Sequence, residues 1–225
     1  MLSKKNKTLK DVKMFREPHG FKYGTGCMPS VMDGTEHELN VDDKLELPDE
    51  FTWQDAMPPV RNQGMSSTCV CQSLTSVLDF MVNGREDTPN VCHNYSINEL
   101  YSIRANKQAE GMTFKEALHY LRHNGLSGEK INSYSKVNSG QAAKYAIVMF
   151  GPIVAGFPVY SGSNPEFWRK RGMFQGGHAV TLVGYNKTGF IIRNSWGTNW
   201  GSRGHVMIPY DEFENNCFEA WTTTL

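Results

Sequence analysis

The chain has 225 residues, which suits one domain or two small lobes and allows a buried core without disulfides. Its 23 basic and 23 acidic side chains cancel, and no basic stripe is present, so the sequence indicates no nucleic-acid partner. Its apolar runs are too short to cross a bilayer, so we expect no membrane anchor.

Residues 1–46, here called the leader, are polar and rich in Gly, Pro and Lys. They show no sustained helical or strand period. The basic start of the leader is not followed by an apolar core, so we expect no secretory signal in this sequence. Two interpretations stay open. The leader is an extension that wraps the surface or enters a cleft, or it is a loosely ordered tail of the kind common at chain ends.

Helices are predicted in the middle of the chain. One should begin near Cys69, because residues 66–68 offer N-cap side chains and apolar residues then recur at helical spacing. Capping-box patterns at residues 96–99 and 113–116 predict two more helices. A fourth is predicted over residues 141–149, where it stops before a Gly-Pro pair.

Strands are predicted in the last third of the chain, where β-branched and aromatic runs alternate with turn residues. The turn at residues 186–189 is typical of a hairpin. Helices first and strands later imply an α+β fold with segregated lobes. The predicted strands cover residues 153–157, 179–185, 189–194, 204–208 and 220–224.

Three short segments carry the candidate chemistry. Gln63 precedes Cys69 by six positions, His178 follows a Gly-Gly pair, and Asn194 begins an Asn-Ser-Trp-Gly run. A thiol becomes a strong nucleophile as a thiolate, and the positive end of a helix beginning at Cys69 favours that form. An imidazole can accept and return the proton. The three segments thus supply a thiol, a base, an orienting amide and an oxyanion donor.

Together these motifs resemble the papain family of cysteine peptidases, from about Leu47 to the C-terminus. The resemblance implies a two-lobe α+β fold with the active site in the cleft between the lobes. A mainly helical lobe would span about 47–145, and an antiparallel β-barrel lobe about 146–225. Residues 1–46 would be an N-terminal extension, acting as a pro-segment of a zymogen or as a leader that blocks the cleft.

The resemblance also implies roles for individual residues. Cys69 would be the nucleophile and His178 the general acid and base, while Asn194 orients His178. Gln63 would donate to the oxyanion together with the backbone N–H of Cys69. Trp196 would cover the bond between His178 and Asn194 and border the substrate. The expected reaction is endopeptidase hydrolysis of a peptide bond through a thioester acyl-enzyme, with no metal or organic cofactor.

Substrate subsites are predicted on the same grounds. Gly111 is the candidate for pairing with the substrate backbone, and Met112 is the candidate for one wall of the substrate pocket. Gly156 and Gly176 would floor a roomy pocket that prefers a bulky apolar residue second from the scissile bond, with Gly177 beside it.

The chain departs from the family pattern at several places. Val70 follows the candidate nucleophile where the family has Trp or Tyr, and His178 lies only 178 − 69 = 109 positions downstream, against roughly 130–150. These departures suggest a compact, divergent member of a microbial or viral type.

Five cysteines are present, so at least one is unpaired in a single chain. Ser66 stands where secreted relatives begin a disulfide, which favours a reducing compartment such as the cytoplasm. Cys71 is expected to be a small buried hydrophobe rather than a metal ligand. Cys27, in the leader, is either a structural thiol or a partner for a reversible inhibitory disulfide with Cys69. The pairing of Cys92 and Cys217 is left open.

Alternatives to the peptidase remain at this point. The same thioester could pass its acyl group to an amine, which would make the protein an acyl transferase or peptide ligase. A leader-inhibited enzyme and an inactive peptide-binding homologue are further alternatives. In each case the expected partner is a peptide or protein, and the chain is expected to act as a monomer.

Overall fold

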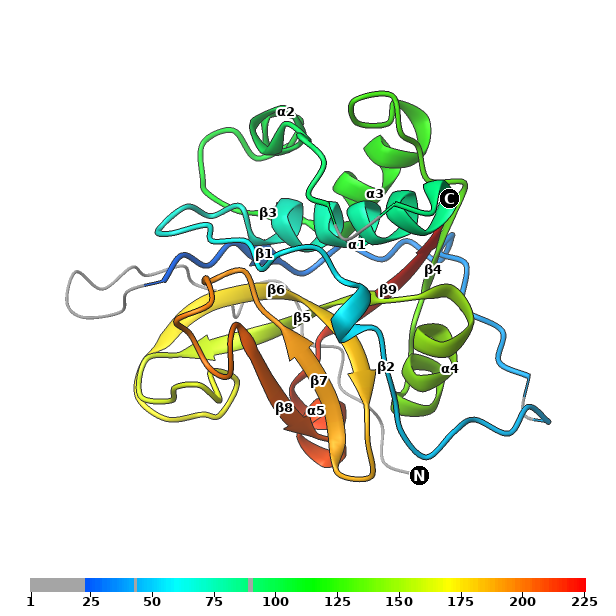
Figure 1. Cartoon of the computed structure of the whole chain (residues 1–225). Coiled ribbons are helices and arrows are strands. Elements are labelled where there is room, and N and C mark those ends of the chain that lie inside the picture. The colour runs from blue at the N-terminus through cyan, green and yellow to red at the C-terminus, as the bar shows by residue number, and fades with distance from the viewer. Residues whose placement is uncertain (1–22, 43, 89–90) are drawn as a thin grey trace.

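A computed structural model describes residues 23–42, 44–88 and 91–225 of the chain. A helical layer lies on one side of the structure and a mainly antiparallel sheet on the other (Figure 1). The predicted α+β arrangement is confirmed. In the helical layer are α1 (Cys69–Glu86), α2 (Ile97–Ser102) and α3 (Phe114–His123).

The capping interactions predicted at the starts of the three helices are formed fully in α3, partly in α2 and not in α1. Thr113 and Glu116 form the complete predicted capping box of α3. Ser96 accepts the backbone N–H of Glu99 at the start of α2, but the Glu99 carboxylate instead accepts a hydrogen bond from Tyr120. Thr68 occupies the N-cap of α1 without a side-chain cap, so the expectation of a capped start is wrong there. Its hydroxyl faces that of Ser66 instead, at 2.8 Å.

A seven-stranded sheet forms the second layer, in the order β4-β9-β5-β6-β7-β8, with β2 also paired to β6. The predicted hairpin joins β6 to β7, with Tyr185 opposite Phe190. Several short elements have no counterpart among the predicted ones, including strands β2 and β4, helix α5 and a 3-10 helix at Gln54–Ala56. The strands are β2 (Phe51–Thr52), β4 (Ser133–Lys136), β5 (Ile153–Tyr160), β6 (Phe174–Tyr185), β7 (Gly189–Arg193), β8 (His205–Pro209) and β9 (Glu219–Thr224).

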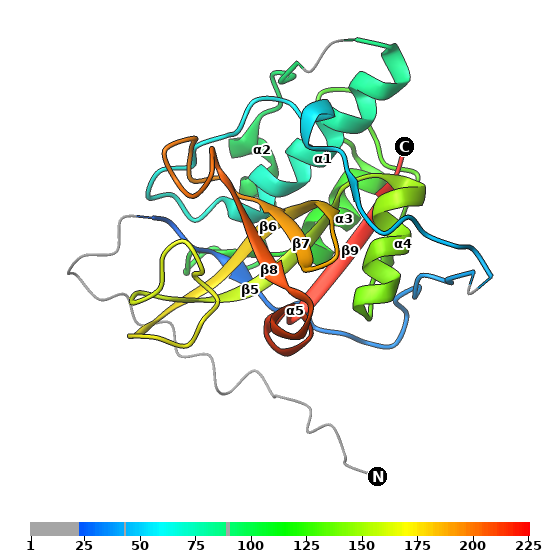
Figure 2. The ribbon, with the colours of Figure 1, turned by 60° about the horizontal axis from the view of Figure 1, so that its bottom comes forward.

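The expected closed barrel is not formed by the strands that the structure describes. β4 and β8 stand at opposite ends of the strand order and do not pair. The face that closure would bury is covered instead by α4 (Gly140–Phe150) and α5 (Tyr210–Asn216), as Figure 2 shows.

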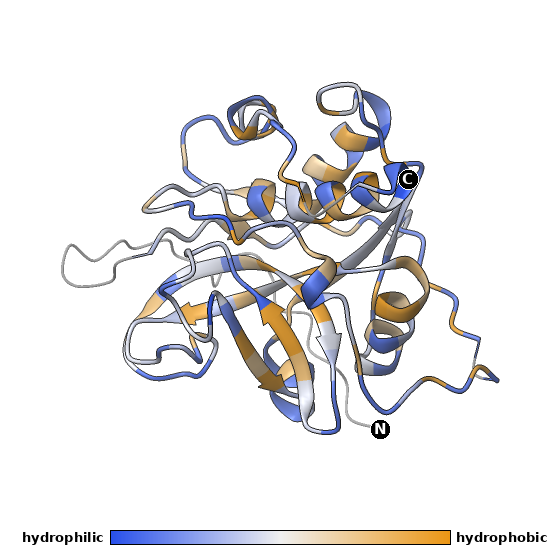
Figure 3. Ribbon diagram, in the orientation of Figure 1, coloured by the Kyte–Doolittle hydropathy of each residue, from blue (hydrophilic) through white to orange (hydrophobic). Residues whose placement is uncertain are grey.

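Two hydrophobic cores meet at the sheet because side chains alternate between its faces. On β5, Val154 packs into the core beneath α1, whereas Ile153, Ala155 and Phe157 pack into the core on the side of α4 and α5. β7 is hydrophobic along most of its length, and the loops around the molecule are mostly hydrophilic (Figure 3). Within the described residues, no helix combines the length and apolar character needed to span a bilayer.

Part of the leader lies between the two layers. β1 (Cys27–Met28) pairs in parallel with β3 (Met112–Thr113), and Figure 1 shows β1 passing between the helical layer and β6. Farther on, Glu38 bridges to Lys136 at the edge of the sheet. The leader therefore both enters the space between the lobes and wraps the surface, whereas the domain boundary near residue 46 stays a prediction.

Candidate active site

Cys69 is the first residue of α1, where the helix dipole favours a negative sulfur. Its side chain is fully buried, and burial raises the pKa of the thiol to about 12. Hydrogen bonds to the sulfur from backbone N–H groups, including those of Ala179 and Cys27, act in the opposite direction without overcoming burial. The contact with Ala179 places the sulfur beside the residue that follows His178.

His178 is held by Asn194. The Nε2 atom of His178 lies 2.7 Å from Oδ1 of Asn194, which also accepts the N–H of Ser195. Nδ1 of His178 is buried and makes no hydrogen bond with any described residue. Burial lowers the pKa of His178 to about 4. An imidazole fixed by one nitrogen and unengaged at the other is suited to exchange a proton with a nearby thiol.

Trp196 covers this pair. Its ring stacks on His178 with centroids 4.2 Å apart and planes 21° from parallel. On its other side lies Tyr23 of the leader, 4.7 Å away and also stacked. The indole N–H donates to the carbonyl of Gly24 at 3.1 Å. Trp196 thus shields the imidazole and at the same time contacts the leader.

Gln63 presents its amide NH2 to the same leader carbonyl. Nε2 donates to Gly24 O at 3.1 Å and to Ser66 O at 2.7 Å, while Oε1 accepts from the hydroxyl of Ser195 at 2.6 Å. The Ser195 contact fixes the amide with its NH2 toward the leader. Gln63 therefore already binds a peptide carbonyl oxygen, which is the capacity that an oxyanion donor needs.

The leader approaches the site through two glycines. A Cβ at Gly24 would lie 2.0 Å from the Ser66 carbonyl oxygen, and one at Gly26 would lie 2.4 Å from that of Ser67. The same two glycines also form backbone hydrogen bonds: the Gly24 N–H donates to Gly64 O, and the Gly26 N–H donates to Gly177 O. Only residues without a side chain can lie this close to the backbone.

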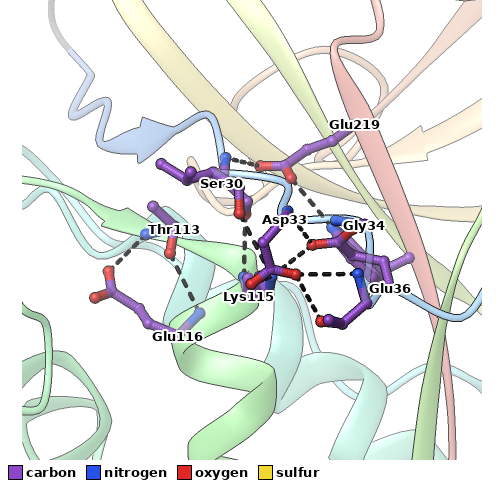
Figure 4. A network of polar contacts seen from close by, with 11 residues as sticks. Ser30, Asp33, Gly34, Glu36, Thr113, Lys115, Glu116 and Glu219 are labelled. Atoms are coloured by element: carbon purple, nitrogen blue, oxygen red, sulfur yellow. Dashed lines mark hydrogen bonds and ion pairs between the residues drawn. The ribbon is translucent and has the colours of Figure 1, made fainter.

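A network beyond the site anchors the next part of the leader to α3 (Figure 4). The Lys115 ammonium lies 2.9 Å from Oδ2 of Asp33 and 2.5 Å from Oε1 of Glu36. The backbone N–H of Lys115 donates to the hydroxyl of Ser30. The backbone N–H of Ser30 in turn donates to the carboxylate of Glu219 in β9 at 3.2 Å.

Comparisons with known proteins found similar cysteine proteases. A family model described as papain family cysteine protease matches residues 130–220. The cathepsin L-like proteinase of Fasciola hepatica is 25% identical over 210 residues, which cover 78% of this chain and 63% of that relative. The structure of xylellain, a cysteine protease from Xylella fastidiosa, matches with a TM-score of 0.77 at 21% identity, covering 93% of this chain and 99% of that one.

The digestive procathepsin L 3 of Tenebrio molitor has the same fold, with a TM-score of 0.68, 18% identity, and coverage of 90% of this chain and 76% of that one. The chain is thus similar in sequence and in fold to papain family cysteine proteases. It spans less than two thirds of the length of its F. hepatica relative.

Gly111, which is predicted to pair with a substrate backbone, lies beside the residue that pairs with the leader. Met112, not Gly111, pairs with the leader, and its N–H donates to Gly26 O at 2.8 Å. Gly111 has a φ of +105°, and a Cβ there would lie 2.9 Å from the same oxygen. The Met112 side chain is fully buried, 3.6 Å from the Cys71 sulfur, so its backbone rather than its side chain faces the leader.

The sequence predicts a roomy substrate pocket over Gly156 and Gly176, but other side chains fill part of that space in this structure. The ring of Phe218 lies 2.5 Å from where a Cβ of Gly156 would be and 3.3 Å from that of Gly177. The Cys27 sulfur lies 3.3 Å from the same Gly156 position. Gly176 instead faces Thr25, whose hydroxyl would lie 2.9 Å from a Cβ there. In the leader-bound structure Phe218 and Cys27 therefore occupy the space that a bulky substrate side chain would need.

Several residues at this site were not singled out from the sequence. The Gly-Thr-Gly run at residues 24–26 is a usable signal, because glycines often mark close backbone approaches. Phe218 and Glu219 carried no comparable signal. Burial raises the pKa of the Glu219 carboxyl to about 6, and this carboxylate accepts hydrogen bonds from Ser30 of the leader and from Trp221.

Proposed function

We propose that this protein is a cysteine endopeptidase whose own leader occupies its active site. The observation that carries the proposal is the position of Cys69, at a helix start and in contact with the backbone of Ala179, which follows the imidazole that Asn194 holds through Nε2. Three elements distant in sequence converge there, and such convergence of roles identifies a nucleophile site better than any single residue.

Hydrolysis would proceed on these residues in two stages. His178 takes the proton of Cys69 as the sulfur attacks the peptide carbonyl, while the Gln63 amide and the Cys69 backbone N–H hold the oxyanion. His178 then gives that proton to the leaving amine, and a thioester remains on Cys69. Water, deprotonated by His178, attacks the thioester and releases the acid.

The leader keeps this pair in its neutral, unreactive form. With the cleft covered, the pKa of Cys69 is about 12 and that of His178 about 4, so the proton stays on sulfur. Both shifts arise mainly from burial, which penalises thiolate and imidazolium alike. Removing the leader would admit water, lower the thiol pKa, raise the imidazole pKa and so favour the reactive ion pair.

The comparisons support the same activity. The F. hepatica relative is called a proteinase, xylellain a cysteine protease, and the T. molitor neighbour a procathepsin. By this proposal the partner is a peptide or protein that takes the place of residues 24–28, the chain acts as a monomer, and it works in a reducing compartment that keeps Cys69 as a thiol.

The test measures thiol reactivity and turnover together. Full-length reduced protein is exposed to an epoxysuccinyl thiol-protease inhibitor, the adduct is mapped, and an internally quenched peptide is assayed in parallel. We expect a slow, single adduct on Cys69, faster labelling and hydrolysis in Gly24→Ala, and neither in Cys69→Ala. Labelling of only the exposed Cys92, or a Gly24→Ala protein that neither labels nor cleaves, would contradict the proposal.

Product analysis with an added amine nucleophile distinguishes the reaction type. A carboxylic acid product supports a peptidase. An amide as the main product would instead indicate an acyl transferase.

A further inference from the structure

Cys27 is a leader residue whose backbone contacts the sulfur of the candidate nucleophile, Cys69. It is 3% exposed and packs in the same hydrophobic core as Cys69. Its backbone N–H donates to the Cys69 sulfur, and its strand is fixed by the bonds from Gly26 to Gly177 and from Met112 to Gly26. A thiol is therefore carried into the active site on a segment that must leave before substrate can enter.

All five cysteines lie in the described part of the chain, and none is in a disulfide there. The Cys27 thiol has two thiol neighbours, Cys69 and Cys217, and a carboxylate neighbour, Glu219. Burial, together with these acidic neighbours, raises the pKa of Cys27 well above its usual value. Docked Cys27 is thus a neutral thiol, protected from oxidation while it stays covered.

We propose that Cys27 is a redox modification site that joins the leader to Cys69 as a disulfide, so that oxidation locks the cleft and reduction allows it to open. The proposal rests on the proposed function only in taking Cys69 as the reactive thiol. The oxidant is a low-molecular-weight disulfide such as glutathione disulfide.

The reaction needs two exchange steps. When the leader lifts away, the solvated Cys27 thiolate attacks glutathione disulfide, forms a mixed disulfide and releases one glutathione thiolate. As the leader returns and before it excludes water from the cleft, Cys69 passes its proton to His178 and attacks the Cys27 sulfur. The second glutathione leaves as a thiolate and takes up the proton from His178. Two protein thiols are oxidised, and one glutathione disulfide is reduced to two glutathione molecules.

Bond formation requires one local movement. The Cys27 sulfur now faces the sheet, 3.3 Å from the position of a Gly156 Cβ, so its side chain must rotate toward Cys69. The backbone of Cys27 is already within hydrogen-bonding reach of the Cys69 sulfur, so the strand itself can stay paired.

Cys69 is favoured over Cys217 as the partner because its sulfur contacts the backbone of Ala179, the residue that follows the imidazole of His178. The Cys217 sulfur donates to the backbone oxygen of Glu219 at 3.3 Å. Burial and the Glu219 carboxylate together raise its pKa, which keeps it protonated and a poor attacking group.

The test uses the full-length chain, reduced and then incubated with excess glutathione disulfide. Trypsin under non-reducing conditions separates residues 23–44, which contain Cys27, from residues 62–85, which contain Cys69 and Cys71. We expect these two peptides to be joined, and the link to persist in Cys71→Ala and Cys217→Ser. Oxidation should abolish epoxysuccinyl labelling of Cys69, and dithiothreitol should restore it.

Matched variants keep the test decisive. In Cys27→Ser and Cys27→Ala, incubation with glutathione disulfide should not form a disulfide between the leader and Cys69. Epoxysuccinyl labelling of Cys69 should then persist, or be lost only where a glutathione adduct is found on Cys69. A link from Cys27 to Cys217, or glutathione adducts alone in the unaltered chain, would overturn the proposal. Failure of the peptidase proposal would appear separately, as absence of labelling in reduced Gly24→Ala.

Discussion

Gly24 crosses Ser66 so closely that a Cβ at position 24 would lie 2.0 Å from the Ser66 carbonyl oxygen. Because the Ser66 oxygen belongs to the backbone, it cannot move aside without a free-energy cost. Gly24→Ala is therefore expected to displace the leader and to break the bonds from its carbonyl to Gln63 and Trp196. If the clash costs about 1–3 kcal/mol, peptide hydrolysis by the full chain should rise about fivefold or more.

Gly84→Ala is the matched control for this change. Gly84 lies in α1, where a Cβ would meet no atom within 4 Å. This variant should keep the activity of the unaltered chain and be slightly more stable to heat, since Ala is the better helix former. Equal activity in both alanine variants would mean that the leader does not limit access to Cys69.

The ion pairs of Lys115 are expected to hold the leader down. Lys115→Met removes its contacts with Asp33 and Glu36 but keeps the backbone bond from residue 115 to Ser30. Because these groups are partly exposed, the gain in hydrolysis rate should be modest, about two- to fivefold, and should shrink as salt is added. Initial rates in low and high salt measure both effects.

The exposed pair between Lys187 and Asp49 provides the comparison for Lys115. It lies outside the leader's contacts with α3, so Lys187→Met should change neither the rate nor its salt dependence. A Lys115→Met protein that behaves like Lys187→Met would argue against an electrostatic anchor.

Acidification is expected to release the leader through His178. Burial lowers the pKa of His178 from 6.5 to about 4, so the docked state binds a proton there less readily than an open, solvated state. Its contribution to docking is fully present above pH 6.5 and is lost as the pH falls toward 4. Asp33 and Glu36 act in the same sense at lower pH, because hydrogen bonds hold their pKa values below the usual range.

Glu219 opposes this effect but is weaker. Its pKa is raised from 4.5 to about 6, so its contribution to docking is present below pH 4.5 and lost as the pH rises through 6. The larger shift belongs to His178, and the net result should favour opening in acid. Hydrogen exchange at residues 24–28, corrected for intrinsic rates, should show about tenfold less protection at pH 4.5 than at pH 7.5. Unchanged protection would rule out this titration as a release mechanism.

The sequence predicted the fold class because helical and strand periodicities separate cleanly along the chain. Gln63, Cys69, His178 and Asn194 were found from local motifs, and the structure places them around one site, although their roles stay predictions. The leader's path was harder to predict, because it docks through backbone hydrogen bonds and bare glycines, which leave no hydrophobic period. The expectation of a closed barrel was wrong, because a sequence pattern of strands does not reveal that α4 and α5 cover one face of the sheet.

Gln63 should have two separable effects when it is removed. Gln63→Ala loses a donor to the leader carbonyl of Gly24 and also the predicted oxyanion donor. Epoxysuccinyl labelling of Cys69 should therefore become faster, while kcat for a peptide falls about 10²–10³-fold. Measuring both in the Gly24→Ala background removes the leader's contribution and leaves the loss in kcat alone. A variant that labels faster and keeps its kcat would show that Gln63 only binds the leader.

Phe218 is expected to set the size of the pocket beside Gly156. Its ring covers Gly156 and Gly177, yet it is 37% exposed, so truncation should enlarge the pocket without emptying the core. In the Gly24→Ala background, Phe218→Ala should raise kcat/KM for a peptide with Leu second from the scissile bond, relative to one with Ala, by about tenfold. Phe150→Ala, which removes a similarly exposed ring from α4, should leave that ratio unchanged. If both variants keep the original ratio, the substrate side chain binds elsewhere and the two glycines serve only the passage of the leader.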